Sequence, residues 1–349
     1  MKFAQGLDSK DLDSLCIVAL ERKTLLEEKV FDGRVGLTQD ARPMLPALLT
    51  ALFFAASGLC GQKAAVKFGS LRGNTLRLAL AAVILAGLTW FLSPVDFTTR
   101  TAKRFLWSGL VGFGVGDVAL FLAYPRLGSR LTVLTSLCSA PLYGALGDWL
   151  LLGFSPSGKQ WICSAIILTG VGLALAGKGG TPQAKIGSSI PGLIAALVSG
   201  CGQGFGASLS RFAQRAAVEE HVRLIGINEA FIRSLPGLAF SWGVWIVVSA
   251  AQKAGTRTGE KHIPLYRSTA QSWMWLLSAA TFGPIIGVSC FQWALRVSPS
   301  SLVLSITATT PLLIMPFAIW LENDRPSLAS VAGGLLAVAG VIALILTRF

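Results

Sequence analysis

Residues 121–157 read FLAYPRLGSRLTVLTSLCSAPLYGALGDWLLLGFSPS, and residues 291–327 read FQWALRVSPSSLVLSITATTPLLIMPFAIWLENDRPS. The two stretches align at an offset of 170 residues without a gap, and the alignment continues to the C-terminus. Identical residues fall in register at Pro141 and Pro311, at Pro156 and Pro326, and at Gly170-Val171 and Gly340-Val341. The C-terminal part of the chain therefore repeats an earlier part.

The composition indicates a chain embedded in a membrane. Of the 349 residues, 53% are hydrophobic and 13% are charged, and the mean hydropathy is +0.63. Soluble domains carry about 25% charged residues, so this chain has too few polar side chains to cover a soluble surface. Many of its apolar blocks are about 20 residues long, which is the length that a helix needs to cross the hydrocarbon core. Because spanning backbone must satisfy its own hydrogen bonds, and the blocks lack the alternation of a membrane barrel, we expect an all-α, polytopic membrane protein.

Hydropathy predicts about ten transmembrane helices. They lie near residues 44–66, 73–93, 104–124, 129–152, 159–177, 189–212, 227–250, 272–295, 300–321 and 327–347. Together with the repeat, these spans predict two halves of five helices, at residues 44–178 and 188–349. An odd number of spans in each half makes the second half enter the membrane from the opposite side, so the repeats are expected to be inverted.

Residues 1–43 differ from everything after them. The first 41 residues hold eight acidic and six basic side chains, and no apolar run there is long enough for a signal peptide. We expect a polar, poorly ordered tail. Two alternatives are a short amphipathic helix over residues 9–30 and a natural start at Met44.

The net charge of +13 does not indicate a nucleic-acid partner, because the basic residues are scattered singly between the apolar blocks. Basic loop residues are nearly balanced between the two faces, so the orientation is weakly specified. With the N-terminus placed inside, an even number of spans puts both termini in the cytoplasm. The six cysteines form no C-x-x-C pair, and His221 and His262 lie in polar stretches, which predicts no metal site. The G-x-x-x-x-G-K-[ST] phosphate loop is also missing, so we expect no cofactor and no direct use of ATP.

Several motifs carry a resemblance to a known family. They are residues 116–121 (GDVALF), 126–130 (RLGSR), 139–142 (SAPL), 150–153 (LLLG) and 168–172 (LTGVG) in the first half, and residues 309–312 (TTPL) and 333–341 in the second. From residue 44 to 349 the chain resembles the drug/metabolite transporter superfamily, specifically its EamA-like members. The family's usual acidic residue after the fourth span is replaced by Phe154, whereas Asp324 fills the equivalent place after the ninth. The resemblance implies an exporter or importer of small metabolites or amino acid-like solutes in a bacterial inner (plasma) membrane, and not an enzyme.

Ionisable side chains inside the spans are the first candidates for a substrate pathway, because a charge that faces lipid costs several kcal/mol. We expect Arg77, Asp117 and Arg233 to point into a polar cavity between the halves, with Arg77 holding an anionic substrate group. Glu229 lies one turn before Arg233 and is its expected ion-pair partner. Asp117 and Asp148 are candidates for carrying a coupling proton. The remaining pathway candidates are Gln62, Asn74, Tyr124, Gln203, Gln292 and Trp293.

Other interpretations stay open. Arg77 could instead snorkel to headgroups, and the other polar residues could be structural. Within transport, Arg77 and Arg233 could clamp phosphate in a nucleotide-sugar or organic-phosphate exchanger. Residues 114–117 (GVGD) match a short intramembrane aspartyl-protease motif, with Asp148 as second carboxylate, so a membrane enzyme or sensor is a further class; helix-packing glycines explain the motif better.

The spans are expected to divide into inner and outer helices. Those that carry charge or amides, the first, second, third, sixth, seventh and eighth, should surround the cavity. The leucine- and valine-rich fourth, fifth, ninth and tenth spans should face lipid or the partner in a homodimer.

Overall fold

The computed structural model describes residues 44–153, 157–176, 189–255, 269–298, 300–322 and 327–346. This part of the chain is helical and contains no strand. The tail at residues 1–43, Phe154 and Asp324 lie outside the described residues. The helices are α2 (Met44–Phe68), α3 (Ser70–Leu92), α4 (Arg100–Gly109), the π-helix η1 (Leu110–Gly116), α5 (Asp117–Leu152), α6 (Gly158–Ala176), α7 (Ser189–Glu219), α8 (Gly226–Gly255), α9 (Ala270–Ala280), the π-helix η4 (Thr281–Gly287), α10 (Val288–Val297), α11 (Ser300–Thr307), α12 (Thr310–Glu322) and α13 (Leu328–Leu346).

Seven helical stretches of the described chain are long and apolar enough to cross a membrane. One of them runs from Arg100 to Leu152, which is 53 residues. At 1.5 Å per residue it would extend about 80 Å, more than twice the hydrocarbon thickness of about 30 Å. The backbone leaves helical geometry inside this stretch at Gly128, whose φ is 76° and ψ is 174°. Only glycine adopts this region without strain, so the sequence permits a sharp break there.

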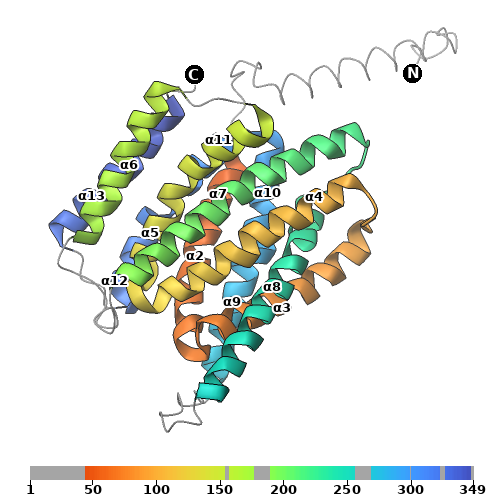
Figure 1. Ribbon diagram of the computed structural model, residues 1–349, viewed down its shortest axis with the longest axis horizontal. Helices are drawn as coiled ribbons and strands as arrows, with labels where there is room; N and C mark the ends of the chain where they lie inside the picture. Colours follow the sequence, from red (N-terminus) through yellow and green to blue (C-terminus); the bar gives the residue numbers. More distant parts are fainter. Residues whose placement is uncertain are drawn as a thin grey trace, which may run out of the picture.

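The helices pack through small residues. α5 and α7 lie side by side along the middle of the molecule (Figure 1). A Cβ added to Gly204 of α7 would lie 2.5 Å from the carbonyl oxygen of Ala140 in α5, and one added to Gly200 would lie 2.6 Å from that of Ser136. Such distances require glycine, as expected where helices are held together by close backbone approach in lipid.

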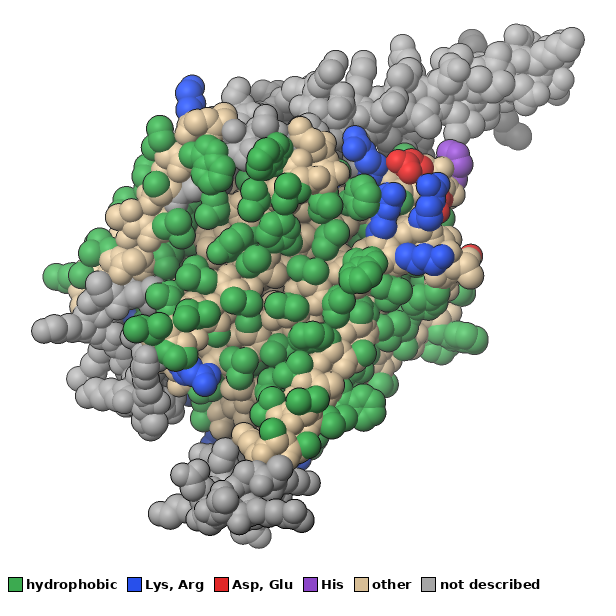
Figure 2. Space-filling view, viewed as in Figure 1, with side chains coloured by type: hydrophobic (Ala, Val, Ile, Leu, Met, Phe, Trp, Pro, Cys, Tyr) green, Lys and Arg blue, Asp and Glu red, His purple; other side chains and the backbone are tan. Residues whose placement is uncertain are grey.

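The surface of the molecule agrees with a membrane environment. Hydrophobic side chains cover most of the visible face, while charged side chains gather at the end where α4 begins and α7 ends (Figure 2). Large apolar side chains on the outside are highly exposed, including Phe91, Trp90 and Trp320, at 86%, 77% and 78%. Exposure of this kind in several helices at once is explained by lipid contact rather than by water.

α6 and α13 lie against each other at one edge of the molecule (Figure 1). A Cβ on Gly170 would meet the backbone nitrogen of Ala337 at 2.4 Å, and one on Gly340 would meet that of Ile167 at 3.1 Å. The outer position expected for the fifth and tenth spans therefore holds. The expectation is wrong for the fourth span, because Val133, Ser136 and Leu137 of α5 line the central pocket described below.

Each half contains a short π-helix in its third span, η1 in one and η4 in the other. The N–H of Asp117, directly after η1, reaches the carbonyl of Gly112 five residues back, and the N–H of Val288, directly after η4, reaches that of Gly283. The two segments are thus equivalent at an offset of 171 residues, one more than the offset after residue 121. Such bulges concentrate at functional sites.

Candidate functional site

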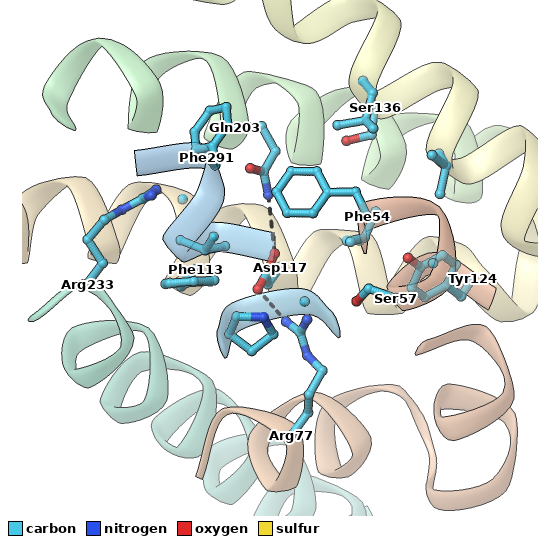
Figure 3. Close-up of a pocket in the computed structure, with 18 residues that line it drawn as sticks. Phe54, Ser57, Arg77, Phe113, Asp117, Tyr124, Ser136, Gln203, Arg233 and Phe291 are labelled. Atoms are coloured by element: carbon cyan, nitrogen blue, oxygen red, sulfur yellow. Dashed lines mark hydrogen bonds and ion pairs between the residues drawn. The ribbon is translucent and has the colours of Figure 1, made fainter. Parts of the chain in front are cut away.

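A pocket of about 60 Å³ lies among α2, α3, α5, α7, α8, α10 and the two π-helices (Figure 3). Its charged lining residues are Arg77, Asp117 and Arg233, and its polar ones include Ser57, Tyr124, Ser136 and Gln203. Aromatic and aliphatic side chains make up the remainder, chiefly Phe54, Phe113, Leu120, Val133, Leu137 and Phe291. Mostly apolar walls with a few convergent polar groups are typical of a small-molecule site.

Arg77 and Asp117 form a buried ion pair across this pocket. Arg77 is 4% exposed and Asp117 is 3% exposed. The Nη2 of Arg77 donates to Oδ2 of Asp117 and to Oδ1 of Asn74, the latter at 3.0 Å, and the guanidinium lies 4.8 Å from the ring centroid of Phe121. Gln203 donates from Nε2 to the other carboxylate oxygen of Asp117 at 3.3 Å. The position of Asp117 is therefore fixed by helices from both halves of the chain.

Arg233 enters the pocket from α8 without such a partner. It is 2% exposed, and neither Nε nor Nη1 has a hydrogen-bond acceptor among the described residues. Its guanidinium carbon lies 5.3 Å from the ring centroid of Phe113, and Figure 3 shows the side chain extending from α8 into the pocket. A buried guanidinium with free donors is costly in an apolar surrounding, because it has lost water and gained no acceptor.

Glu229 does not pair with Arg233 as expected. Its carboxylate accepts a hydrogen bond from Arg296 at 2.5 Å and another from Gln214 at 3.0 Å. The Gln214 amide also donates to the carbonyl oxygen of Gln292, whose own side chain donates to Ser210. The local i,i+4 interpretation is wrong because Arg296, from α10, reaches Glu229 from across the helix interface.

The other predicted residues lie away from the pocket lining. Asp148 is buried near the end of α5, accepts a hydrogen bond from Ser300 and lies 3.9 Å from Nη1 of Arg211. Trp293 is 45% exposed on the outer side of α10. Gln62 and Gln292 are buried but are not part of the lining. Asn74 is also outside the lining and accepts a hydrogen bond from Arg77. Of the predicted set, the pocket thus brings together Arg77, Asp117, Arg233, Gln203 and Tyr124.

Several lining residues were not singled out in the sequence. Ser57, Phe113 and Val288 have no unusual chemistry in an apolar span, so nothing but their place in three dimensions marks them. The π-helices carried a signal, because η1 follows Gly109 and contains Gly112, Gly114 and Gly116.

No group of three His, Cys, Asp or Glu side chains that could hold a metal occurs in the described chain.

Comparisons with known proteins identify the family. Residues 42–176 and 230–346 match the model of the EamA-like transporter family. A solved structure described only as "Crystal structure of protein" matches with a TM-score of 0.55 at 16% identity, covering 88% of this chain and 98% of that one, and so shares the fold. The curated proteins contain no match. Because both family matches together cover more than half of its length, this chain belongs to the EamA-like transporter family and is a multi-pass membrane transporter of the drug/metabolite type.

Proposed function

We propose that the protein is a secondary transporter of small metabolites or amino acid-like solutes, which works by alternating access between residues 44–178 and 188–349. The observation that carries this proposal is the central pocket. Its lining comes from both halves, and it holds three charged side chains that would each cost several kcal/mol in contact with lipid. A substrate bound there would touch both halves, so their relative movement would change its access to either side.

Ten spans in two inverted repeats are the architecture we propose for this movement. The 53-residue stretch is long enough for two spans and breaks at Gly128, and α6 and α13 add two shorter helices to the seven stretches. The glycine contacts between α6 and α13 are reciprocal at the repeat offset of 170: residue 170 meets 337, and residue 167 meets 340. Contacts that exchange in this way are what a two-fold axis between repeats produces. On this architecture both termini lie on one side, which we propose to be the cytoplasm.

The size of the pocket favours a small solute over a nucleotide sugar. A volume of about 60 Å³ leaves room for about four to six water molecules, at about 10–15 Å³ each. Pockets for drug-sized ligands occupy about 300–1,000 Å³. An exchanger of nucleotide sugars would need a much larger space than this conformation offers.

The proposal is tested by transport in proteoliposomes. A metabolite screen that compares cells overexpressing the protein with cells lacking it selects the solutes to load. Wild-type protein should move at least one of them, and Asp117→Asn should slow this movement at least tenfold, because it removes the charge that orients Arg77 and Gln203. The matched control is Asp96→Asn, in the loop before α4, where the carboxylate accepts hydrogen bonds from the backbone N–H and the hydroxyl of Thr98. Wild-type protein that moves none of the screened solutes would contradict the proposal.

A further inference from the structure

We propose that Arg233 is the receptor for a carboxylate of the substrate, and that this carboxylate occupies the position that an internal aspartate occupies beside Arg77. This inference rests on the proposed transport function and assigns the substrate class: a small organic acid with one carboxylate and an apolar body.

The two arginines have equivalent surroundings in the two halves. Arg77, in the second span, reaches η4 of the other half, where a Cβ on Gly283 would lie 3.0 Å from its Nη1. Arg233, in the seventh span, reaches η1, where a Cβ on Gly112 would lie 2.8 Å from its Nη2. Gly112 and Gly283 are equivalent positions of the two π-helices, five residues before Asp117 and Val288. Each arginine thus lies beside the equivalent glycine of the opposite half.

Only one of the two π-helices is directly followed by a carboxylate residue. Asp117 directly follows η1 and pairs with Arg77. The residue directly after η4 is Val288, which lines the same pocket and has no acceptor to offer. The pocket lining therefore holds two arginines and one aspartate, a formal excess of one positive charge.

Arg233 carries that excess. Its Nε and Nη1 have no acceptor among the described residues, although the side chain is 2% exposed. Asp117 and Glu229 act on it electrostatically, but their carboxylates accept hydrogen bonds from other side chains. Asp117 accepts from Arg77 and Gln203, and Glu229 accepts from Arg296 and Gln214. A carboxylate is the complement of this guanidinium, because it can accept two parallel hydrogen bonds, either from Nε and Nη2 or from Nη1 and Nη2.

Apart from the charged residues and Gln203, the lining is mainly apolar and has hydroxyl groups at Ser57, Tyr124 and Ser136, which indicates what the rest of the ligand can be. Phe54, Leu120, Val133, Leu137 and Phe291 offer apolar contact, and the second arginine is already neutralised by Asp117. A phosphate with two charges would leave one of them without a partner in an apolar site, which is costly. The chemistry of the lining therefore fits a monoanion whose non-acidic part is mainly apolar.

The first test does not depend on transport. Val288→Asp supplies the missing internal carboxylate, and Val288→Asn is its uncharged control; both are made in the wild-type and Arg233→Gln backgrounds, and the melting temperature Tm of purified protein is measured. We expect Val288→Asp to keep a Tm within a few degrees of that of Val288→Asn while Arg233 is present. In the Arg233→Gln background the new carboxylate has no partner, so its Tm should fall well below that of the control. Equal losses in both backgrounds would overturn the inference and leave the transport proposal standing.

The second test uses propionate as a probe and propionamide as its uncharged isostere, because each has a size that the pocket can hold. Propionate should raise the Tm of the wild-type protein in a concentration-dependent way, and propionamide should not. The half-saturating propionate concentration should rise at least tenfold in Arg233→Gln and in Val288→Asp. Stabilisation by both compounds alike, or by propionate in Arg233→Gln at wild-type concentrations, would show that Arg233 does not bind the carboxylate. Uptake of a screened solute by proteoliposomes, measured separately, reports on the transport function itself.

Discussion

The ion pair between Arg77 and Asp117 changes what is expected of Arg77. The sequence suggested that Arg77 itself holds an anionic substrate, but its Nη2 already donates to Asp117 and Asn74. Its role in the structure is to hold a carboxylate of the protein. Removing Arg77 would leave that carboxylate buried without its cation, which affects stability before it affects substrate binding.

A double-mutant cycle measures this coupling. Arg77→Ala and Asp117→Ala should each lower the free energy of unfolding by about 3–5 kcal/mol, because each leaves a buried charge unpaired. The double variant Arg77→Ala/Asp117→Ala should lose less than the sum of the two. The measurement is denaturant or thermal unfolding in detergent. Additive losses would mean that the two side chains do not depend on each other.

Two glycines of the third span provide a matched pair of substitutions. A Cβ on Gly109 would lie 2.1 Å from the carbonyl oxygen of Arg233 and 2.5 Å from its Cα, and this backbone cannot move without shifting α8. A Cβ on Gly112 would lie 2.8 Å from Nη2 at the end of the Arg233 side chain, and its nearest backbone neighbour, the carbonyl oxygen of Gly202, would be at an ordinary contact distance of 3.8 Å. Gly109→Ala should therefore lower Tm markedly, whereas Gly112→Ala should leave Tm within a few degrees of wild type and weaken transport several-fold by displacing the guanidinium. Similar effects of both substitutions on Tm would contradict this distinction.

Sequence reasoning located the charged part of the site but not its pairing. Charged side chains inside apolar spans are expected to face the interior of the helix bundle, because exposing them to lipid is costly. Their convergence follows from this cost. Which of them meet depends on helix rotation and on close approach at glycines. Glu229 illustrates this, because its partner Arg296 is 67 residues away in sequence rather than one turn along the same helix.

At the scale of elements, the start of α4 is held by a side chain of the other half. Glu220, directly after α7, accepts hydrogen bonds at 3.0 Å from the backbone N–H groups of both Arg100 and Thr101, and one at 2.8 Å from the hydroxyl of Thr101. The first N–H groups of a helix have no partner within it and carry partial positive charge, so a carboxylate there is stabilising. These bonds lower the pKa of Glu220 from 4.5 to about 2.

This shift predicts how stability depends on pH. Because the pKa is lower in the folded protein, the contribution of Glu220 is fully present above about pH 4.5 and is lost as the pH falls towards about 2. Glu220→Gln should therefore lower Tm at pH 7, and the difference from wild type should shrink as the pH is lowered from 5 to 2.5. Glu219→Gln, at the exposed neighbouring residue, is the control and should change Tm little at either end. A difference that stays constant over this range would exclude the carboxylate as its cause.

Hydropathy predicted the helices more completely than their interiors. Every predicted span overlaps a described helix, although α7 continues to Glu219, seven residues beyond its predicted end. The two π-helices escaped prediction, since glycines permit a widened turn without dictating it. In each π-helix an arginine from the opposite half passes beside a glycine, Gly112 or Gly283, and this tertiary contact has no signature in the sequence. The leucine and valine content of the fourth span likewise led to the wrong prediction that it is an outer helix. Some apolar residues of α5 in fact line the pocket.

At the scale of the whole molecule, the internal repeat explains why a pocket forms where it does. Equivalent segments of both halves, with their π-helices, meet around the centre, and each contributes an arginine to the same space. The halves differ in charge where one has Asp117 and the other has Val288 at the equivalent position. A site built in this way keeps the geometry of two equal halves and gives only one of the arginines an internal counter-ion.

The number of crossings gives the last prediction, because ten and seven spans place parts of the chain on different sides. If the stretch from Arg100 to Leu152 crosses twice, with its break at Gly128, the loop at Asp96, the start of α6 at Gly158 and the end of α13 all lie on one side, and Gly69 lies on the other. If it crosses once and the two shorter helices do not cross, Gly158 and the end of α13 lie opposite Asp96. Single cysteines at positions 69, 96 and 158, in a protein whose native cysteines are replaced by alanine, are labelled in sealed vesicles with a reagent that cannot cross the bilayer. We expect positions 96 and 158 to be labelled together and position 69 only from the other side. Labelling of 158 together with 69 would rule out the double crossing, and with it the inverted repeat on which alternating access depends.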